Sequence, residues 1–162
     1  MTAKFGNGKR LVESFVIGAG FTLLITGLAK AWSAIGPARA LDVAEPIFGV
    51  PFRQLMLGVG LLELFVAFFC LFTDERQFSL LAVTWLATNF VVYRLGLLWI
   101  GWRRPCGCLG NLTDILHISP GVADLIMKVV LVYLLLGGYG LLVWMWWQRR
   151  AETRRRASLT SA

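Results

Sequence analysis

The chain has 162 residues, of which 57% are hydrophobic and 15% are charged, and its mean hydropathy is +0.70. Soluble domains of this length rarely have such a composition, so the sequence indicates an integral membrane protein. The net charge is +7, but most of the excess lies in two basic ends that flank apolar segments. Because membrane topology and anionic lipid account for such ends, we expect no nucleic-acid partner.

Four apolar segments are long enough to cross a bilayer as helices, which takes about 20 residues each. They are Leu11–Ile35, Phe52–Phe72, Phe78–Ile100 and Gly121–Trp147. The connections between them leave room for one bundle and no second domain. The sequence therefore predicts an all-α integral membrane protein, a four-transmembrane-helix bundle over residues 11–147 between basic segments at 1–10 and 148–162.

Basic residues are distributed unevenly between the two sides of this bundle. One side has Lys4, Lys9, Arg10, Arg76, Arg149, Arg150, Arg154, Arg155 and Arg156, and the other has Arg39, Arg53, Arg103 and Arg104. The positive-inside rule assigns the side with more Lys and Arg to the cytoplasm. We therefore expect both termini in the cytoplasm and the third connection on the periplasmic side of a bacterial inner membrane.

The third connection contains the motif with the clearest chemistry. Residues 103–110 read Arg-Arg-Pro-Cys-Gly-Cys-Leu-Gly, so Cys106 and Cys108 are one residue apart. Their sulfurs leave the backbone within bonding reach of each other, and Gly107 can adopt the backbone angles that ring closure requires. An oxidising compartment allows such a bond to form. We predict that Cys106 and Cys108 form a redox pair that opens and closes.

Two other interpretations of this pair stay open. It can be a static disulfide, although disulfides that close short loops tend to be strained and labile. It can also be half of a zinc site with Asp114 and His117, but structural zinc sites more often use paired Cys-x-x-Cys motifs, so we expect no metal. The remaining cysteine, Cys70, lies near the opposite end of the second span, where we expect a packing role.

Charged side chains inside the predicted spans each cost roughly 2.5–3.5 kcal/mol on insertion, so each requires an explanation. They are Lys30, Glu63, Arg94, Asp124 and Lys128. Glu63 lies midway along the second span, and its expected partner is Lys30, Arg94 or Lys128. The sequence does not choose among these three. Asp124 and Lys128 are four residues apart on one helix face and can pair with each other.

We predict that Lys30, Glu63, Arg94 and Lys128 form a polar pocket beneath the cysteine connection. With Asp124 included, the formal charge of the set is +1, and nearby positive charge stabilises the reactive thiolate form of cysteine. Hydrogen bonds from Arg94 or Lys128 could also hold the oxygens of a quinone, the candidate cofactor. The alternatives are a structural ion pair between helices and, for Lys30, a position at the interface without function.

Three segments resemble a known family. They are Thr26-Gly27-Leu28-Ala29-Lys30, the stretch from Gly58 to Glu63, and Cys106-Gly107-Cys108-Leu109-Gly110, which is the specific one. From Leu11 to about Trp147 the chain resembles the DoxX-like superfamily of small four-span membrane proteins, and within it the MauE branch (methylamine utilisation protein MauE).

The resemblance implies disulfide chemistry outside the cytoplasmic membrane with a thioredoxin-like partner, and it implies that Cys106 and Cys108 are the redox pair. Other DoxX relatives are linked to quinone-coupled sulfur oxidation. The four-helix arrangement is also similar to that of membrane enzymes that form disulfides and reduce quinone. Those enzymes usually have a Cys-x-x-Cys motif and a second cysteine pair, which this sequence lacks.

The residues and the resemblance together predict a membrane-embedded thiol–disulfide redox protein. It would pass electrons through Cys106 and Cys108 between a periplasmic thioredoxin-like or disulfide-containing partner and another acceptor. The alternative is a non-catalytic integral membrane subunit that scaffolds or caps a larger membrane protein complex. A small transporter is disfavoured, because no inverted repeat is visible in the four spans.

Overall fold

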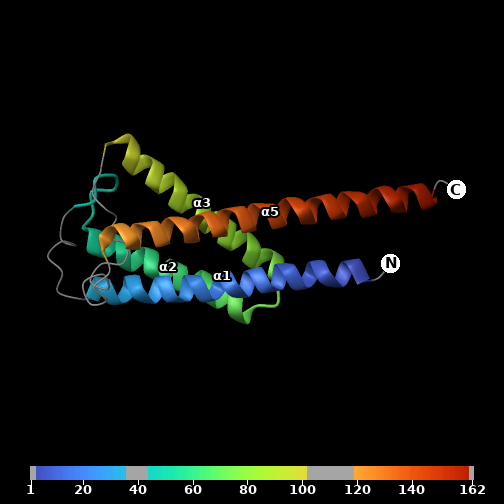
Figure 1. The fold of residues 1–162 in the computed structure, drawn as a ribbon, viewed down its shortest axis with the longest axis horizontal. Helices are drawn as coiled ribbons and strands as arrows, with labels where there is room; N and C mark the ends of the chain where they lie inside the picture. Colours follow the sequence, from blue (N-terminus) through green and yellow to red (C-terminus); the bar gives the residue numbers. More distant parts are fainter. Residues whose placement is uncertain (1–2, 36–43, 102–118, 161–162) are drawn as a thin grey trace.

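The computed structural model describes residues 3–35, 44–101 and 119–160. In chain order they form the helices α1 (Ala3–Ile35), α2 (Phe52–Phe72), α3 (Arg76–Trp99) and α5 (Pro120–Thr160). The helices make an elongated bundle in which α1 begins and α5 ends at the same end (Figure 1). We call this the terminal end, and we call the opposite end, where α1 ends and α5 begins, the loop end.

Each helix contains a stretch that is long and apolar enough to cross a membrane. These stretches are Gly8–Ile35, Phe52–Phe72, Arg76–Trp99 and Gly121–Ala151. Helices are expected here because a backbone surrounded by hydrocarbon must satisfy its hydrogen bonds within its own segment. The four predicted spans are confirmed, with bounds that differ by a few residues.

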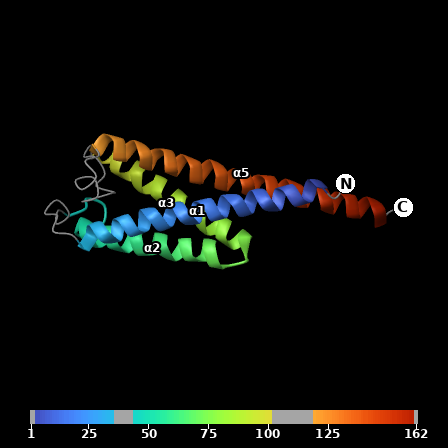
Figure 2. The same cartoon turned by 60° about the horizontal axis from the view of Figure 1, so that its bottom comes forward.

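Helix α5 is much longer than a bilayer requires. It has 41 residues, which corresponds to about 60 Å, or roughly twice the thickness of the hydrocarbon core. Its last turns extend beyond the rest of the bundle at the terminal end (Figures 1 and 2). The basic segment that follows the fourth span is therefore a continuation of the helix, up to Thr160.

Helices α1 and α2 approach each other closely at two glycines. A Cβ atom added to Gly27 would lie 3.0 Å from the carbonyl oxygen of Gly60, and one added to Gly60 would lie 3.1 Å from the carbonyl oxygen of Gly27. Small residues at a helix crossing allow the two backbones to meet in this way. The contact fixes the register of α1 against α2 and brings the following turn of α1 opposite Glu63.

The apolar core lies towards the terminal end of the bundle. Val16 and Leu23 of α1, Cys70 of α2, Leu80 of α3 and Leu134 of α5 belong to it, and each is at most 2% exposed. Cys70 is a free, buried cysteine, which confirms its predicted packing role. Towards the loop end the packing is less complete, and a cavity opens between the helices.

Candidate functional site

The cavity has a volume of about 360 Å³ and is lined by side chains from α1, α2, α3 and α5 and from the turn before α2. Its lining is mainly apolar and includes Leu23, Phe52, Met56, Trp85, Phe90 and Leu131. The polar lining residues are Thr26, Lys30, Glu63, Asn89, Tyr93 and Arg94. Of the four residues predicted to form a polar pocket, Lys30, Glu63 and Arg94 therefore line one cavity, whereas Lys128 is not part of its lining.

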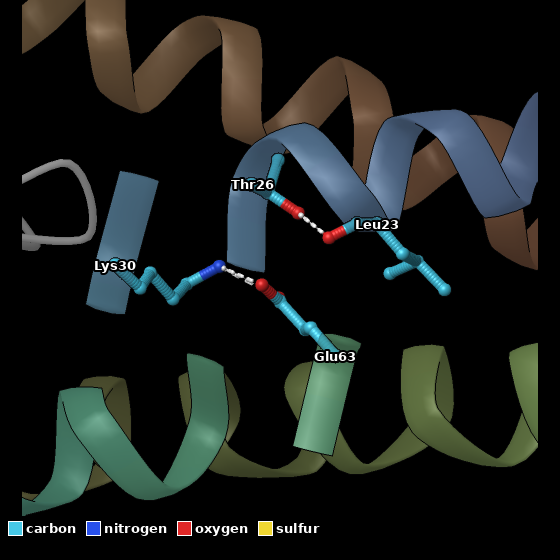
Figure 3. Close-up of polar contacts among 4 residues, drawn as sticks. All are labelled: Leu23, Thr26, Lys30 and Glu63. Atoms are coloured by element: carbon cyan, nitrogen blue, oxygen red, sulfur yellow. Dashed lines mark hydrogen bonds and ion pairs between the residues drawn. The ribbon is translucent and has the colours of Figure 1, made fainter. Parts of the chain in front are cut away.

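Lys30 and Glu63 form a buried ion pair across the α1–α2 contact. The Lys30 Nζ atom donates to both carboxylate oxygens of Glu63, at 2.6 Å to Oε1 and 2.7 Å to Oε2 (Figure 3). Lys30 is 5% exposed and Glu63 is 1% exposed. The structure thus selects Lys30 from the three cations that the sequence left open. The glycine contact explains this choice, because Gly27 and Gly60 each lie one turn before a member of the pair.

A second polar cluster joins α3 to α5 near the loop end. Arg94 donates from Nη2 to Oδ1 of Asp124, and Lys128 Nζ lies 2.8 Å from Oδ2 of the same carboxylate. The predicted pairing of Asp124 with Lys128 is confirmed, and Arg94 is an additional partner. The Lys128 side chain is 58% exposed, so it contacts Asp124 from outside the cavity.

Glu45 is a buried carboxylate at the loop end that the sequence analysis did not single out. It is fully buried and accepts hydrogen bonds from the backbone N–H groups of Ile47, at 3.0 Å, and Phe48, at 2.6 Å. Its other oxygen accepts from the Tyr93 hydroxyl at 3.1 Å. The Phe48 and Tyr93 rings stack with centroids 6.3 Å apart. Glu45 therefore holds two aromatic residues that line the cavity.

The turn that contains Glu45 depends on Gly49. Gly49 has a φ angle of 67°, in the left-handed region where a residue without Cβ is favoured. Its N–H donates to the Glu45 carbonyl at 2.9 Å, and the Glu45 N–H donates to Val50 at 2.8 Å. In the sequence, the only indication of a role for Glu45 is that its carboxylate precedes Pro46 in a short turn. Nothing in the sequence pairs this carboxylate with Tyr93.

We expect Glu45→Ala to destabilise the protein by about 1–3 kcal/mol, because it leaves two backbone donors and the Tyr93 hydroxyl without their acceptor. Thermal unfolding in detergent, followed by circular dichroism, measures this effect. Tyr93→Phe removes only one of the three hydrogen bonds and should cost less. Equal losses in the two variants would contradict the bridging role of Glu45.

Asn89 is the other residue that the sequence analysis missed. It lies near the middle of α3 and lines the cavity, and its Nδ2 donates to the Trp85 carbonyl at 2.8 Å. The sequence did contain a signal for Asn89, because placing a primary amide within an apolar span costs free energy of desolvation, as placing a charge there does. Only the fold reveals that this amide lies at the cavity.

The predicted redox cysteines lie outside the described residues, as do Asp114 and His117. The described chain stops at Gly101 and resumes at Ser119.

The chain matches a known protein family over most of its length. Residues 8–148 match the family described as methylamine utilisation protein MauE, a range that includes the first three spans and all but the last three residues of the fourth. Among curated proteins and solved structures, none matches the chain significantly. The resemblance noted from the sequence is thereby confirmed, and the chain is a multi-pass membrane protein that belongs to the MauE family.

Proposed function

We propose that this protein is a thiol–disulfide redox protein of the bacterial inner membrane, with Cys106 and Cys108 as its reactive pair on the periplasmic side. The observation that carries the proposal is the Cys-Gly-Cys motif in the connection between the third and fourth spans. A thioredoxin-like or disulfide-containing periplasmic protein is the proposed partner.

The polar cluster at the loop end supports this proposal. Arg94 and Asp124 pair across α3 and α5, close to Gly101 and Ser119, where the described chain stops and resumes. The two helices that flank the cysteine-containing connection are therefore joined, near the ends at which it leaves them, by a cluster with two cations and one carboxylate. A local excess of positive charge favours the thiolate, which is the form of cysteine that attacks a disulfide.

The proposed reaction is a pair of thiol–disulfide exchanges. One thiolate of the reduced pair attacks a sulfur of the partner disulfide, forms a mixed disulfide and releases the other partner sulfur as a thiolate. The neighbouring thiol loses its proton and attacks the mixed disulfide, which frees the second partner sulfur. The pair is then oxidised to a disulfide, and the partner has gained two electrons and two protons. The reverse sequence oxidises the partner.

We expect alkylation trapping in intact membranes to show a redox pair that titrates across a series of thiol–disulfide buffers. Cys106→Ser and Cys108→Ser should each abolish the titration. In one of the two variants a mixed disulfide with a partner should accumulate, because the resolving thiol is missing. Cys70→Ser is the matched control and should leave the titration unchanged, because Cys70 is buried in the core.

A second candidate function is a non-catalytic subunit that scaffolds or caps a larger membrane complex. It is favoured by the sparse packing of the fourth helix, in whose apolar stretch 17% of residues are buried, against 39% in that of α1. A partner helix could cover the remainder. Purification at a fixed stoichiometry with another membrane protein, together with full activity of both cysteine variants, would favour this function over the first.

A further inference from the structure

The cavity combines an apolar wall with an amide that has unused hydrogen-bonding capacity. Among the described residues Asn89 has one partner, the Trp85 carbonyl, which occupies one N–H of its amide. The second N–H and the amide oxygen are thus left for a ligand. Asn89 is an exposed residue of the lining, one turn after Trp85, which also lines the cavity and is exposed. It lies 13 residues after Arg76 and 10 before Trp99, so it is near mid-depth of its span, where hydrocarbon and not water surrounds these groups.

The charged residues of the lining indicate that a neutral ligand fits. Lys30 is neutralised by Glu63, and Arg94 contacts Asp124. Among the described lining residues, every charged side chain therefore has an opposite charge as partner. The second cation on Asp124 is Lys128, which is 58% exposed and is not part of the lining. A carboxylate or phosphate head in the cavity would therefore meet no unpaired cation, at a high cost in a medium of low dielectric constant.

The aromatic and apolar residues of the lining favour a flat ring with an apolar tail. Phe52, Trp85 and Phe90 supply aromatic walls, and the volume of about 360 Å³ is within the range of about 300–1,000 Å³ that is usual for small-molecule sites. Leu62 and Trp85 line the cavity and are 37% and 58% exposed. The cavity is therefore open between α2 and α3 towards the surrounding lipid.

We propose that this cavity binds a neutral, lipid-soluble carbonyl compound of the quinone class, with Asn89 as the hydrogen-bonding residue. The amide suits both redox forms, because its N–H donates to a quinone carbonyl and its oxygen accepts from a hydroquinone hydroxyl. This site adds an electron acceptor to the proposed function. Its redox role rests on that function. As the two thiols of the reduced pair close to a disulfide, they lose two electrons and two protons, and the quinone gains both to become hydroquinone.

Binding can be tested separately from redox turnover. The full chain is placed in nanodiscs of zwitterionic lipid and titrated with a benzoquinone that carries a decyl tail, and quenching of tryptophan fluorescence is recorded. We expect saturable quenching that is the same in the Cys106→Ser/Cys108→Ser variant. If the quinone binds but the cysteine pair shows no thiol exchange, only the proposed function is overturned. If thiol exchange occurs but the quinone does not bind, only the cavity site is overturned.

Two matched pairs of variants assign the binding to the cavity. Val59→Phe fills the cavity and should abolish saturable quenching, whereas Leu61→Phe, on an exposed position of the same helix that is not part of the lining, should not. Asn89→Leu should weaken binding about three- to tenfold, the effect of one lost hydrogen bond. The adjacent Thr88→Val should leave it unchanged, because the Thr88 hydroxyl contacts Thr84 and Tyr139.

Thermal unfolding of each variant establishes that it is folded before it is titrated. Decanoic acid is the competitor that tests the charge argument, and we expect it not to displace the quinone. Displacement by decanoic acid at the same concentration would show a fatty-acid site and overturn the quinone assignment. Equal quenching in the Val59→Phe and Leu61→Phe variants would show partition into lipid alone and overturn the site itself.

Discussion

Glu63→Leu and Lys30→Met should each lower the free energy of unfolding by about 3–5 kcal/mol, the largest effect that we expect from any single substitution outside the cysteine pair. Each removes one member of an ion pair whose side chains are 7% and 1% exposed. The remaining charge then has no opposite charge nearby and no water to solvate it. Denaturant or thermal unfolding in detergent micelles measures the loss.

The double variant Lys30→Met/Glu63→Leu separates the ion pair from the packing of the two side chains. It buries no charge, so we expect it to be more stable than either single variant. Lys128→Met is a control for loss of an exposed cation and should cost less than about 1 kcal/mol. A double variant as unstable as the sum of the two single variants would contradict direct coupling of Lys30 and Glu63.

The second large effect is expected at the α1–α2 crossing. Gly60→Leu should destabilise the protein by about 1–3 kcal/mol. A Cβ atom at Gly60 would lie 3.1 Å from the Gly27 carbonyl oxygen and 3.2 Å from the Ala31 backbone nitrogen. These are backbone atoms, which cannot rotate away as a side chain can. The two helices must therefore move apart, and the distance between Lys30 Nζ and the Glu63 carboxylate should increase.

Gly58→Leu provides the matched control on the same helix. A Cβ atom at Gly58 meets nothing within 4 Å, so the same change in size and helix propensity occurs without a clash. We expect the Gly58 variant to unfold at or above the temperature of the original protein and the Gly60 variant to unfold well below it. Equal unfolding temperatures would show that the close contact does not determine stability.

Hydropathy alone predicted the four spans to within a few residues at their ends, because the bilayer requires an uninterrupted apolar helix wherever the chain crosses it. It also marked Lys30, Glu63 and Arg94 as residues that need partners. It could not assign those partners. Lys30 and Glu63 are 33 residues apart in the chain, and whether they meet depends on the rotation and register of two helices, which the glycines at their crossing determine.

The sequence by itself determined the membrane class, the number of spans and the Cys-Gly-Cys motif, since these depend on composition and on neighbours in the chain. Only the tertiary structure joined Glu45 to Tyr93 and placed Asn89 beside a cavity. Both depend on contacts between segments that are distant in sequence, and hydropathy does not encode how such segments face one another. The cavity exists because the helices pack tightly towards the terminal end and less completely towards the loop end.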